Sequence, residues 1–519
     1  MLDDFSGVTL DFFRAILPDV DNYRIKARLA DILWTLHRPR CFEDALTAID
    51  AYILFPLDAK GLSQERKAWR RAILLAKQLK GGAVDRLASI KSYILNELTK
   101  AKCANGHHAL WLAQLAMLTG LTAGESLTIA NKLRFFGIHF DRKSSGHRAR
   151  DYYQYSAELL NNVNNKEDIV RLKTLIAESF IAQGKQKQCD DSPSNIAAGH
   201  FFECALHELR TIENSQREKY GIEKMINDVY RMMQDANKKF LNEMMTIEIP
   251  IEKADELKNI AKDSVAGITF PEVLFELANM IPGAKESDHR ETAEKILFKH
   301  PLSALFGASH YTHDGRIAAR TPGVDLDCKD NPDTQARIWA EMIQDFVRLV
   351  NMTVQTMIIP ALHIVRLEHR FSLDALFSIC KESAIVPRDR VLLWAKGLYF
   401  GFDLDFISAI HILSPQVEHF VRRMLKNSGI KTTTLDSKGI ETENGLSTLL
   451  DKPGVENCFP SDWLFELKAL LTDSVGPNLR NDCAHGLLSS NQANSAEAVY
   501  FWWFCLRLVV NHLPWRSNS

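Results

Sequence analysis

The sequence predicts an all-α protein, and two observations lead to this fold class. Apolar residues recur about every 3.6 residues through most of the chain, as in Ile25–Leu36, Trp69–Leu79 and Ala198–Ile212. The sequence shows no sustained alternation of apolar and polar residues of the kind that indicates strands. We expect β structure only in short segments near 247–251 and 432–441, the second of which has a glycine, Gly439, in its turn.

Changes in composition divide the chain into three predicted regions. Residues 1–245 contain successive amphipathic helices separated by glycines and polar turns, and they predict an irregular or solenoid-like helical domain. Residues 246–385 predict a middle helical region with an irregular loop over 307–332 and a long helix that is interrupted at Pro360. Residues 386–519 predict a C-terminal bundle of four or five helices.

The overall composition is that of an ordinary globular protein. The formal net charge is −2, so nucleic-acid binding would require a local basic patch. The 9 cysteines lack Cys-x2-Cys spacing, which is typical of reduced thiols. The acidic segment Met1–Phe5 does not resemble a signal peptide, and no apolar run reaches the length of a membrane span. We therefore expect a cytoplasmic protein.

The segment 478–488, Asn-Leu-Arg-Asn-Asp-Cys-Ala-His-Gly-Leu-Leu, contains side chains that suit work on a phosphate. Arg480 can bind a phosphate, and His485 can transfer protons near neutral pH. The preceding Gly-Pro-Asn predicts a helix start, so we expect both side chains near a helix N-terminus, about 140° apart around the axis. Asn481 lies four residues before His485, and we expect it to orient the imidazole. A structural network at the helix start is the alternative interpretation.

The same Arg-x4-His spacing recurs in less suitable surroundings. Arg134/His139 has apolar residues between its ends. Arg142/His147 lies in a predicted loop, and Arg507/His512 lies in a core-like run. The surroundings therefore favour Arg480 and His485.

Arg480-Asn481 followed by His485 resembles the Arg-polar-x3-His signature of the HEPN superfamily, many of whose members are dimeric, all-helical ribonucleases of bacterial toxin, antiphage and RNA-decay systems. A wider pattern resembles a bacterial family of unknown function with a C-terminal HEPN-like bundle. Its features here are Val386-Pro387-Arg388, Lys396-Gly397-Leu398, Asp405-Phe406, Leu413–Glu418, Arg422 and Gly476–Asn481. This resemblance spans residues 386–510, with a weaker extension through 302–323.

The resemblance implies a metal-independent endoribonuclease that leaves a 2′,3′-cyclic phosphate and a 5′-hydroxyl. The 2′-hydroxyl of RNA attacks the adjacent phosphorus, His485 acts as base or acid, and Arg480 stabilises the added charge. One histidine cannot easily serve both ends of this displacement, so the HEPN-type dimer would supply a second set. The aromatic run Tyr500–Phe504, more than a small bundle easily buries, also predicts a homodimer through the C-terminal bundle. RNA is the expected partner, and no metal or other cofactor is expected.

Glu418 and Arg422 are the expected supporting residues of the site. They lie four residues apart on one predicted helix, and an intrahelical ion pair is the favoured interpretation. In the alternative interpretation, Glu418 holds Arg480 or polarises His485 across the bundle.

Other clusters are interpreted as structural. His310, His313 and Asp314 are potential metal ligands, but a hydrogen-bonded loop is favoured because no companion ligand motif accompanies them. The basic run Arg66–Arg71 includes an aromatic residue and could contact RNA, although a solvated helix face is the favoured interpretation.

Two further function classes stay open. One is a catalytically inactive HEPN dimer that binds RNA or nucleotides. The other is a helical scaffold whose residues 1–245 bind a protein partner or regulator. A cleavage assay separates the enzyme from both classes, and RNA binding separates the two classes from each other.

Overall fold

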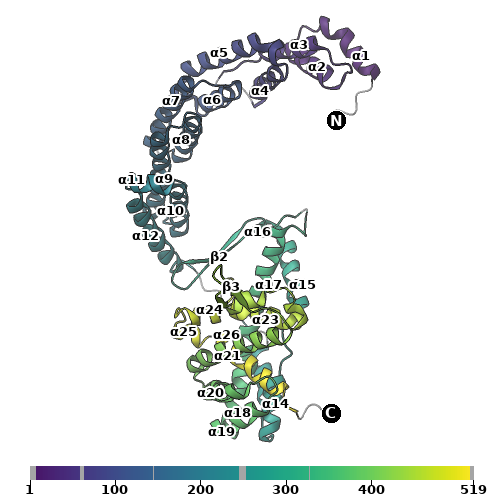
Figure 1. Cartoon of the computed structure of the whole chain (residues 1–519), viewed down its shortest axis with the longest axis vertical. Coiled ribbons are helices and arrows are strands. Elements are labelled where there is room, and N and C mark those ends of the chain that lie inside the picture. Colours follow the sequence, from purple (N-terminus) through teal and green to yellow (C-terminus); the bar gives the residue numbers. More distant parts are fainter. Residues whose placement is uncertain are drawn as a thin grey trace. The chain divides into compact units, whose positions relative to one another are not determined.

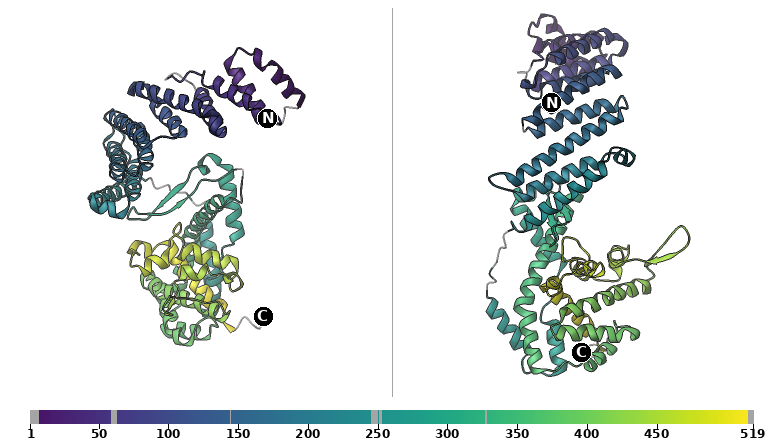
Figure 2. Two further views of the ribbon diagram at one scale, coloured as in Figure 1. Left: turned by 45° about the horizontal axis from the view of Figure 1, so that its top comes forward. Right: turned by 90° about the vertical axis from the view of Figure 1, so that its left-hand side faces the viewer.

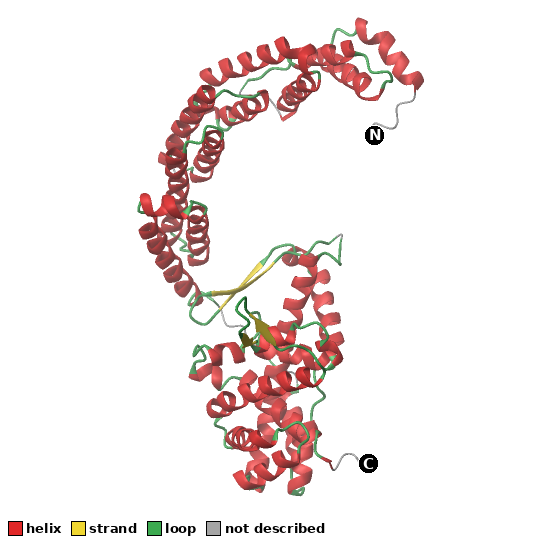
Figure 3. Ribbon diagram, viewed as in Figure 1, coloured by secondary structure: helices red, strands yellow, loops and turns green. Residues whose placement is uncertain are grey.

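Helices make up nearly all of the regular structure in the computed structural model, as Figure 3 shows. The structure describes residues 7–58, 63–143, 145–244, 250, 253–326 and 328–514. The chain forms two compact units, Met1–Met244 and Met245–Ser519, which are considered separately below. The predicted all-α class is confirmed.

The first unit consists of helices that pack mainly on their neighbours in sequence (Figures 1 and 2). Its α-helices are α1 (Gly7–Ile16), α2 (Tyr23–Leu36), α3 (Phe42–Tyr52), α4 (Ser63–Gln78), α5 (Val84–Lys100), α6 (His108–Thr119), α7 (Ala123–Arg142), α8 (Gly146–Asn161), α9 (Lys166–Cys189), α10 (Asn195–Arg210), α11 (Asn214–Lys219) and α12 (Ile222–Leu241). Short 3-10 turns are η1 (Leu17–Asp19), η2 (Lys80–Ala83) and η3 (Cys103–Asn105). Stacking of neighbours along the chain is the solenoid-like arrangement that the helix pattern predicted.

Polar side chains mark the beginnings of these helices. The Asn22 side chain accepts a hydrogen bond from the backbone N–H of Arg24 at 3.0 Å, at the start of α2. Thr122 and Glu125 exchange hydrogen bonds in a capping box at the start of α7. The Ser194 hydroxyl accepts a hydrogen bond from the backbone N–H of Ala197 at 3.4 Å, at the start of α10. Each cap satisfies a backbone N–H that has no partner within the helix, so local sequence sets where these helices begin.

The basic run Arg66–Arg71 lies on α4, and its aromatic residue is not available to a ligand. Trp69 is only 2% exposed, donates a hydrogen bond to the carbonyl of Phe55 at 2.9 Å, and stacks on Tyr93. Contact between RNA and this tryptophan is therefore excluded by its burial in the unit's own core.

The second unit is also helical and contains two small antiparallel hairpins. Its α-helices are α13 (Ala254–Val265), α14 (Phe270–Asn279), α15 (Glu286–Lys299), α16 (Pro301–Ala304), α17 (Pro332–Thr353), α18 (Ile359–Glu368), α19 (Leu373–Glu382), α20 (Val391–Phe402), α21 (Phe406–Asn427), α22 (Leu446–Leu450), α23 (Ser461–Leu471), α24 (Leu479–Ala484), α25 (Ser490–Ala493) and α26 (Ala496–Asn511). The remaining elements are strands β1 (Ala308–Tyr311), β2 (Ile317–Thr321), β3 (Thr433–Leu435) and β4 (Glu441–Glu443), a π-helical turn η4 (Val354–Ile358), and the 3-10 turns η5 (Arg388–Arg390) and η6 (Val455–Asn457).

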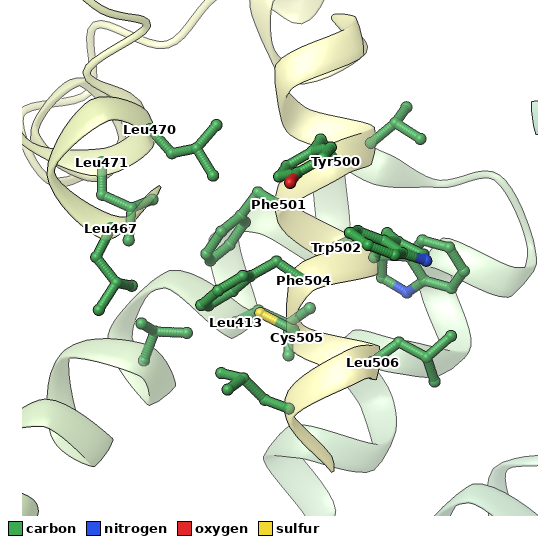
Figure 4. Packing of buried hydrophobic residues seen from close by; sticks show 14 of the residues in the cluster. Leu413, Leu467, Leu470, Leu471, Tyr500, Phe501, Trp502, Phe504, Cys505 and Leu506 are labelled. Atoms are coloured by element: carbon green, nitrogen blue, oxygen red, sulfur yellow. The ribbon is translucent and has the colours of Figure 1, made fainter. Parts of the chain in front are cut away.

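Helix α26 occupies the centre of the second unit's core. Every residue from Ala498 to Val510 is buried, so this predominantly apolar helix is enclosed on all sides, and its one charged residue in this stretch, Arg507, is paired with Glu466. Figure 4 shows its aromatic side chains packed against leucines of α21 and α23. The indole N–H of Trp502 donates to the carbonyl of Leu398 at 3.1 Å, and that of Trp503 donates to the carbonyl of Leu277 at 2.7 Å. These bonds satisfy the polar atoms that burial of tryptophan would otherwise leave unpaired.

The enclosure of α26 joins the two regions predicted on either side of residue 385. Helices α14 and α17 pack on it from the region 246–385, and α20 and α21 pack on it from the region 386–519. A single hydrophobic cluster runs from Ala261 to Val510. The aromatic run Tyr500–Phe504 is therefore covered within its own unit, and it no longer gives a reason to expect a dimer.

The structure bears differently on the three segments for which an irregular loop or β structure was predicted. The segment 307–332 is not irregular throughout, because β1 and β2 form a hairpin in which Ala308 pairs with Thr321. Gly315 lies in the turn of this hairpin with a φ of 85°. The sequence pattern did not identify this glycine as part of a hairpin turn. Strands β3 and β4 form the predicted hairpin near 432–441. The strand expected at 247–251 lies outside the described residues, apart from Pro250.

The long helix expected around Pro360 is present. Helix α17 passes through the π-helical turn η4 into α18, whose first turn contains Pro360. Together they form Pro332–Glu368, the one helix of the described chain that is long and apolar enough to cross a membrane. Ile338, Met342 and Phe346 on this helix are fully buried in the core of the unit. Core helices of this kind meet the same length and composition criterion.

Gly401 provides a test of the close packing around α26. A β-carbon at this position would overlap the indole of Trp502. We expect Gly401→Ala to lower the free energy of unfolding by about 1–3 kcal/mol, because the buried indole has no space to move into. Lys396→Ala, an exposed change on the same helix α20, should stay within about 0.5 kcal/mol. Urea unfolding of both variants checks this, and equal stabilities would contradict it.

Candidate active site

The predicted motif lies on a short helix, α24, that follows a tightly packed loop. Asp473 anchors the loop by accepting hydrogen bonds from the Trp339 indole and the Val475 backbone N–H, at 2.8 and 2.9 Å. A β-carbon on Gly476 would overlap the carbonyl of Ala469, so the loop passes where only glycine fits. The loop therefore fixes the position from which α24 begins.

The helix begins and ends at residues other than those predicted. Asn478 precedes it in a left-handed conformation, with a φ of 53° and no side-chain cap, and Pro477 lies outside it. Gly486 has a φ of 67°, and the N–H of Leu487 bonds to the carbonyl of Asp482 at 2.8 Å. This left-handed glycine cap ends the helix at Ala484. Arg480 lies in the first turn of α24, as expected, whereas His485 follows its last residue, so the expected placement of His485 near a helix N-terminus is wrong.

Arg480 is held by two side chains. Its Nε donates to Oε2 of Glu418 at 2.7 Å, and its Nη2 lies 2.5 Å from the same oxygen. Its Nη1 donates to Oδ1 of Asn481 at 3.0 Å. The Arg480 side chain is 19% exposed and the Glu418 side chain is 16% exposed. The guanidinium is consequently oriented before any ligand arrives, which lowers the entropic cost of using it.

Glu418 also binds the second predicted supporting residue, Arg422. The Arg422 guanidinium donates to Oε1 of Glu418 at 2.7 Å, to Glu443 at 2.6 Å and to the carbonyl of Asn444 at 2.7 Å. Glu418 therefore makes both of the interactions considered for it, the ion pair with Arg422 within α21 and the ion pair with Arg480 on α24. One carboxylate therefore lies between two guanidinium groups and reduces their repulsion.

Asn481 does not act on His485 as expected. Its Nδ2 donates to Oδ1 of Asn478 at 2.8 Å and lies 3.4 Å from both the Ser447 hydroxyl and the Thr472 carbonyl. Its side-chain oxygen is used by Arg480. Asn481 thus ties the preceding loop to the Arg480 guanidinium. The side chain of His485 is exposed and has no hydrogen bond to another side chain or carbonyl in the described part of the chain.

The turn between β1 and β2 places charged residues near Asp482 that the motif on α24 does not include. Burial raises the pKa of Asp482 on α24, and the nearby charges of Arg316, His313 and His485 oppose that rise. His313 and Arg316 are both exposed at the hairpin turn. Asp482 therefore has a second histidine and a further arginine in its surroundings. In the sequence, the only sign of these residues is the cluster around His313, for which the alternatives are a metal site and a hydrogen-bonded loop.

That cluster does not converge on one point. The His310 ring contacts the Gln344 amide at 3.4 Å and the Thr321 hydroxyl at 3.5 Å, while the Asp314 carboxylate accepts from the Thr312 hydroxyl. Burial lowers the pKa of His310, and the charge of Arg337 lowers it further. In the described ranges, no group of three or more His, Cys, Asp or Glu side chains is arranged to hold a metal ion.

A cavity of about 440 Å³ lies beside the start of α24. Polar groups from α17 and from the ends of α25 and α26 line it together with the loop before α24; they are Gln344, Arg348, Gln492, Ser495 and Glu497. Its volume is in the range of small-ligand sites. Leu479 at the start of the motif helix lines this cavity, but Arg480 and His485 are not among its lining residues.

The rival Arg-x4-His pairs are engaged in structure. Arg134 donates to Asp168 at 3.2 Å on α9. Arg507 is 7% exposed and donates to the fully buried Glu466, which also accepts from the Tyr500 hydroxyl at 2.7 Å. The pair Arg142/His147 spans the short connection between α7, which ends at Arg142, and α8, which begins at Gly146.

Comparison with known proteins identifies one segment. Residues 1–88 match a family described as Domain of unknown function (DUF7380). The match covers α1 to α4 and does not reach the second unit. Neither a curated protein nor a solved structure matches the chain.

Glu418 offers a test of this network. Glu418→Ala leaves two partly buried guanidinium groups without their shared carboxylate, and we expect it to lower the free energy of unfolding by about 2–4 kcal/mol. Glu418→Gln should cost less, because an amide oxygen still accepts a hydrogen bond. Glu456→Ala, which removes an exposed carboxylate of the same unit, serves as the control. If urea unfolding gives Glu418→Ala the stability of the control, the network does not support the site.

Proposed function

We propose that the second unit cleaves RNA without a metal ion and that Arg480 and His485 carry the reaction. The observation behind this proposal is the contrast between the two side chains. Arg480 is oriented by Glu418 and Asn481, whereas His485, five residues later, is exposed and unengaged by neighbouring side chains. A fixed cation and a free imidazole on the same short helix supply the charge stabilisation and the proton transfer that phosphate chemistry uses. The HEPN resemblance of the motif supports the same conclusion.

The N–H groups of Arg480 that are not used by Glu418 or Asn481 are available to bind a phosphate. The contacts of Arg480 occupy Nε–H and one N–H on each terminal nitrogen, so two of its five N–H groups are left for a phosphate. These can stabilise negative charge as the 2′-hydroxyl attacks phosphorus. His485 carries an imidazole, which can both accept and donate a proton, and it removes the 2′ proton or protonates the departing 5′ oxygen. The products are a 2′,3′-cyclic phosphate and a 5′-hydroxyl.

The histidine and arginine variants test the reaction. We expect His485→Ala and Arg480→Ala each to lower RNA cleavage by at least about 100-fold, through loss of proton transfer and of charge stabilisation respectively. Asn481→Ala should have a smaller effect, because Asn481 positions Arg480. Cleavage of a labelled RNA, with product ends identified by mass spectrometry, is the measurement. Cleavage should persist in chelator.

The other histidines act as matched controls for this assay. His139→Ala and His147→Ala remove imidazoles of the first unit, and His512→Ala removes one from the end of α26; all should retain activity in folded protein. Cleavage that survives loss of His485, or that depends on added divalent metal, would contradict the mechanism. Wild-type protein that binds RNA without cutting it would indicate a binding module, and protein that does neither would indicate a scaffold.

The source of the second proton-transfer group distinguishes two versions of the mechanism. We propose the homodimer that the HEPN resemblance implies, in which a second copy supplies it. The alternative source is His313 at the hairpin turn, whose charge acts on Asp482. We expect light scattering to find a dimer. We also expect the cleavage rate of His313→Ala to stay within about tenfold of the wild-type rate, which is the size of effect expected when one exposed hydrogen-bonding group is lost. A monomer whose activity disappears in His313→Ala would replace the dimer with a single-chain site.

On the biological role, we propose a bacterial toxin or antiphage effector, as in many HEPN-like ribonucleases. Growth arrest on expression of the wild type, and its absence with His485→Ala, is the expected result.

A further inference from the structure

The first unit contains a basic cavity that is independent of the site on α24. Helices α2 and α4, together with the end of α3 and the following Phe55, border an open cavity of about 740 Å³. Its lining consists of Arg24, Arg28, Asp31, Ile32, Thr35, Tyr52, Phe55, Gln64, Lys67, Ala68 and Arg71. All of these residues lie within the segment that matches the family of unknown function. The volume falls in the range of pockets that enclose small ligands, about 300–1,000 Å³.

One wall of the cavity is preorganised by a buried carboxylate. Asp31 is 4% exposed and accepts hydrogen bonds from Nε and Nη2 of Arg71, at 2.9 and 2.6 Å to its two oxygens. The hydroxyl of Tyr52 donates to the same carboxylate at 2.9 Å. The charge of Asp31 is therefore satisfied within the wall. Arg71 is held in place with a side chain that is still 33% exposed.

The rest of the lining has an excess of positive charge. Arg24, Arg28 and Lys67 are exposed around the cavity, and Asp31 is its one lining carboxylate. Arg24 donates to Glu65 at 3.2 Å and lies 5.2 Å from the ring centre of Phe55. Within the described ranges Lys67 has no hydrogen-bond or ion-pair partner. Arg28 forms a hydrogen bond with the uncharged hydroxyl of Tyr52, so within the described ranges neither Arg28 nor Lys67 is paired with a carboxylate.

The floor of the cavity is apolar and aromatic. The rings of Tyr52 and Phe55 lie 6.0 Å apart between centres, and Ile32 and Ala68 complete the floor. A ligand that satisfies both parts carries a compact multivalent anion next to a flat or apolar group. Arginine forks match phosphate oxygens in geometry, and the parts of Tyr52 and Phe55 that line the cavity offer a nucleoside an apolar contact surface.

We propose that this cavity binds a nucleoside phosphate, with the phosphate among Arg28, Lys67 and Arg71 and the nucleoside against Tyr52 and Phe55. The same chemistry is offered by a free nucleotide and by the 5′-phosphorylated end of an RNA. An acidic protein segment would also be attracted to the rim, but its carboxylates are spaced along a chain, whereas these cations line one cavity.

Binding to the full-length protein tests the proposal. The probes are ATP and a ten-nucleotide RNA with either a 5′-phosphate or a 5′-hydroxyl, in both cases with 2′-O-methyl riboses that lack the nucleophile for cleavage. Titration calorimetry should give saturable binding of ATP or of the 5′-phosphorylated RNA. The double variant Arg28→Ala, Lys67→Ala should weaken it at least tenfold, because both removed groups contact the phosphate.

Arg70→Ala is the matched control, since Arg70 lies on α4 and is exposed but does not line the cavity. It removes one positive charge from the same helix and should leave affinity within twofold. Binding of ATP assigns the site to free nucleotides, and binding restricted to 5′-phosphorylated RNA assigns it to RNA ends. Equal effects of the control and the double variant, or binding of a polyglutamate peptide but of no phosphate probe, would overturn the proposal. The outcome is independent of whether the second unit cleaves RNA.

Discussion

The requirement to enclose α26 is the constraint on which the arrangement of the second unit depends. A helix with no polar face cannot lie at a surface, and about 0.8 kcal/mol of hydrophobic free energy is associated with each buried CH₂ group. Elements from residues 254–382 and from residues 391–471 therefore surround it together. The same enclosure brings α17 and the loop before α24 together, as the Trp339–Asp473 hydrogen bond shows. The site thus depends on packing that involves most of the unit.

Carboxylates organise the positive groups in both units. Glu418 orients Arg480, and Asp31 orients Arg71, each through hydrogen bonds to the Nε side of the guanidinium. A paired arginine keeps part of its donor set and loses rotational freedom, so it is better prepared for an anion than a free side chain. With a formal net charge of only −2, the protein can attract phosphate only where such local arrangements leave positive charge in excess.

The hairpin β1–β2 changes the interpretation of the site on α24. It carries His313 and Arg316, whose charges act on Asp482, and it packs on α17 through Thr321 and Arg337. A second histidine in the surroundings of the motif is relevant to any reaction in which two oxygens exchange protons. Its contribution comes from a segment more than 160 residues away in sequence, as the numbers of Arg316 and Asp482 show.

The sequence by itself determined the helical class, the helix starts marked by Thr122 and Ser194, and the residues of the motif, because these depend on periodicity and on contacts within a few residues. It also selected Glu418 and Arg422 for their spacing on one helix face. Only the tertiary structure decided that Glu418 also holds Arg480, that Asn481 serves Arg480 and not His485, and that Tyr500–Phe504 is internal. These outcomes depend on which distant surfaces meet around α26, and local patterns do not encode that. The end of α24 before the left-handed Gly486 is different, because a glycine after the last helical turn is a local stop signal.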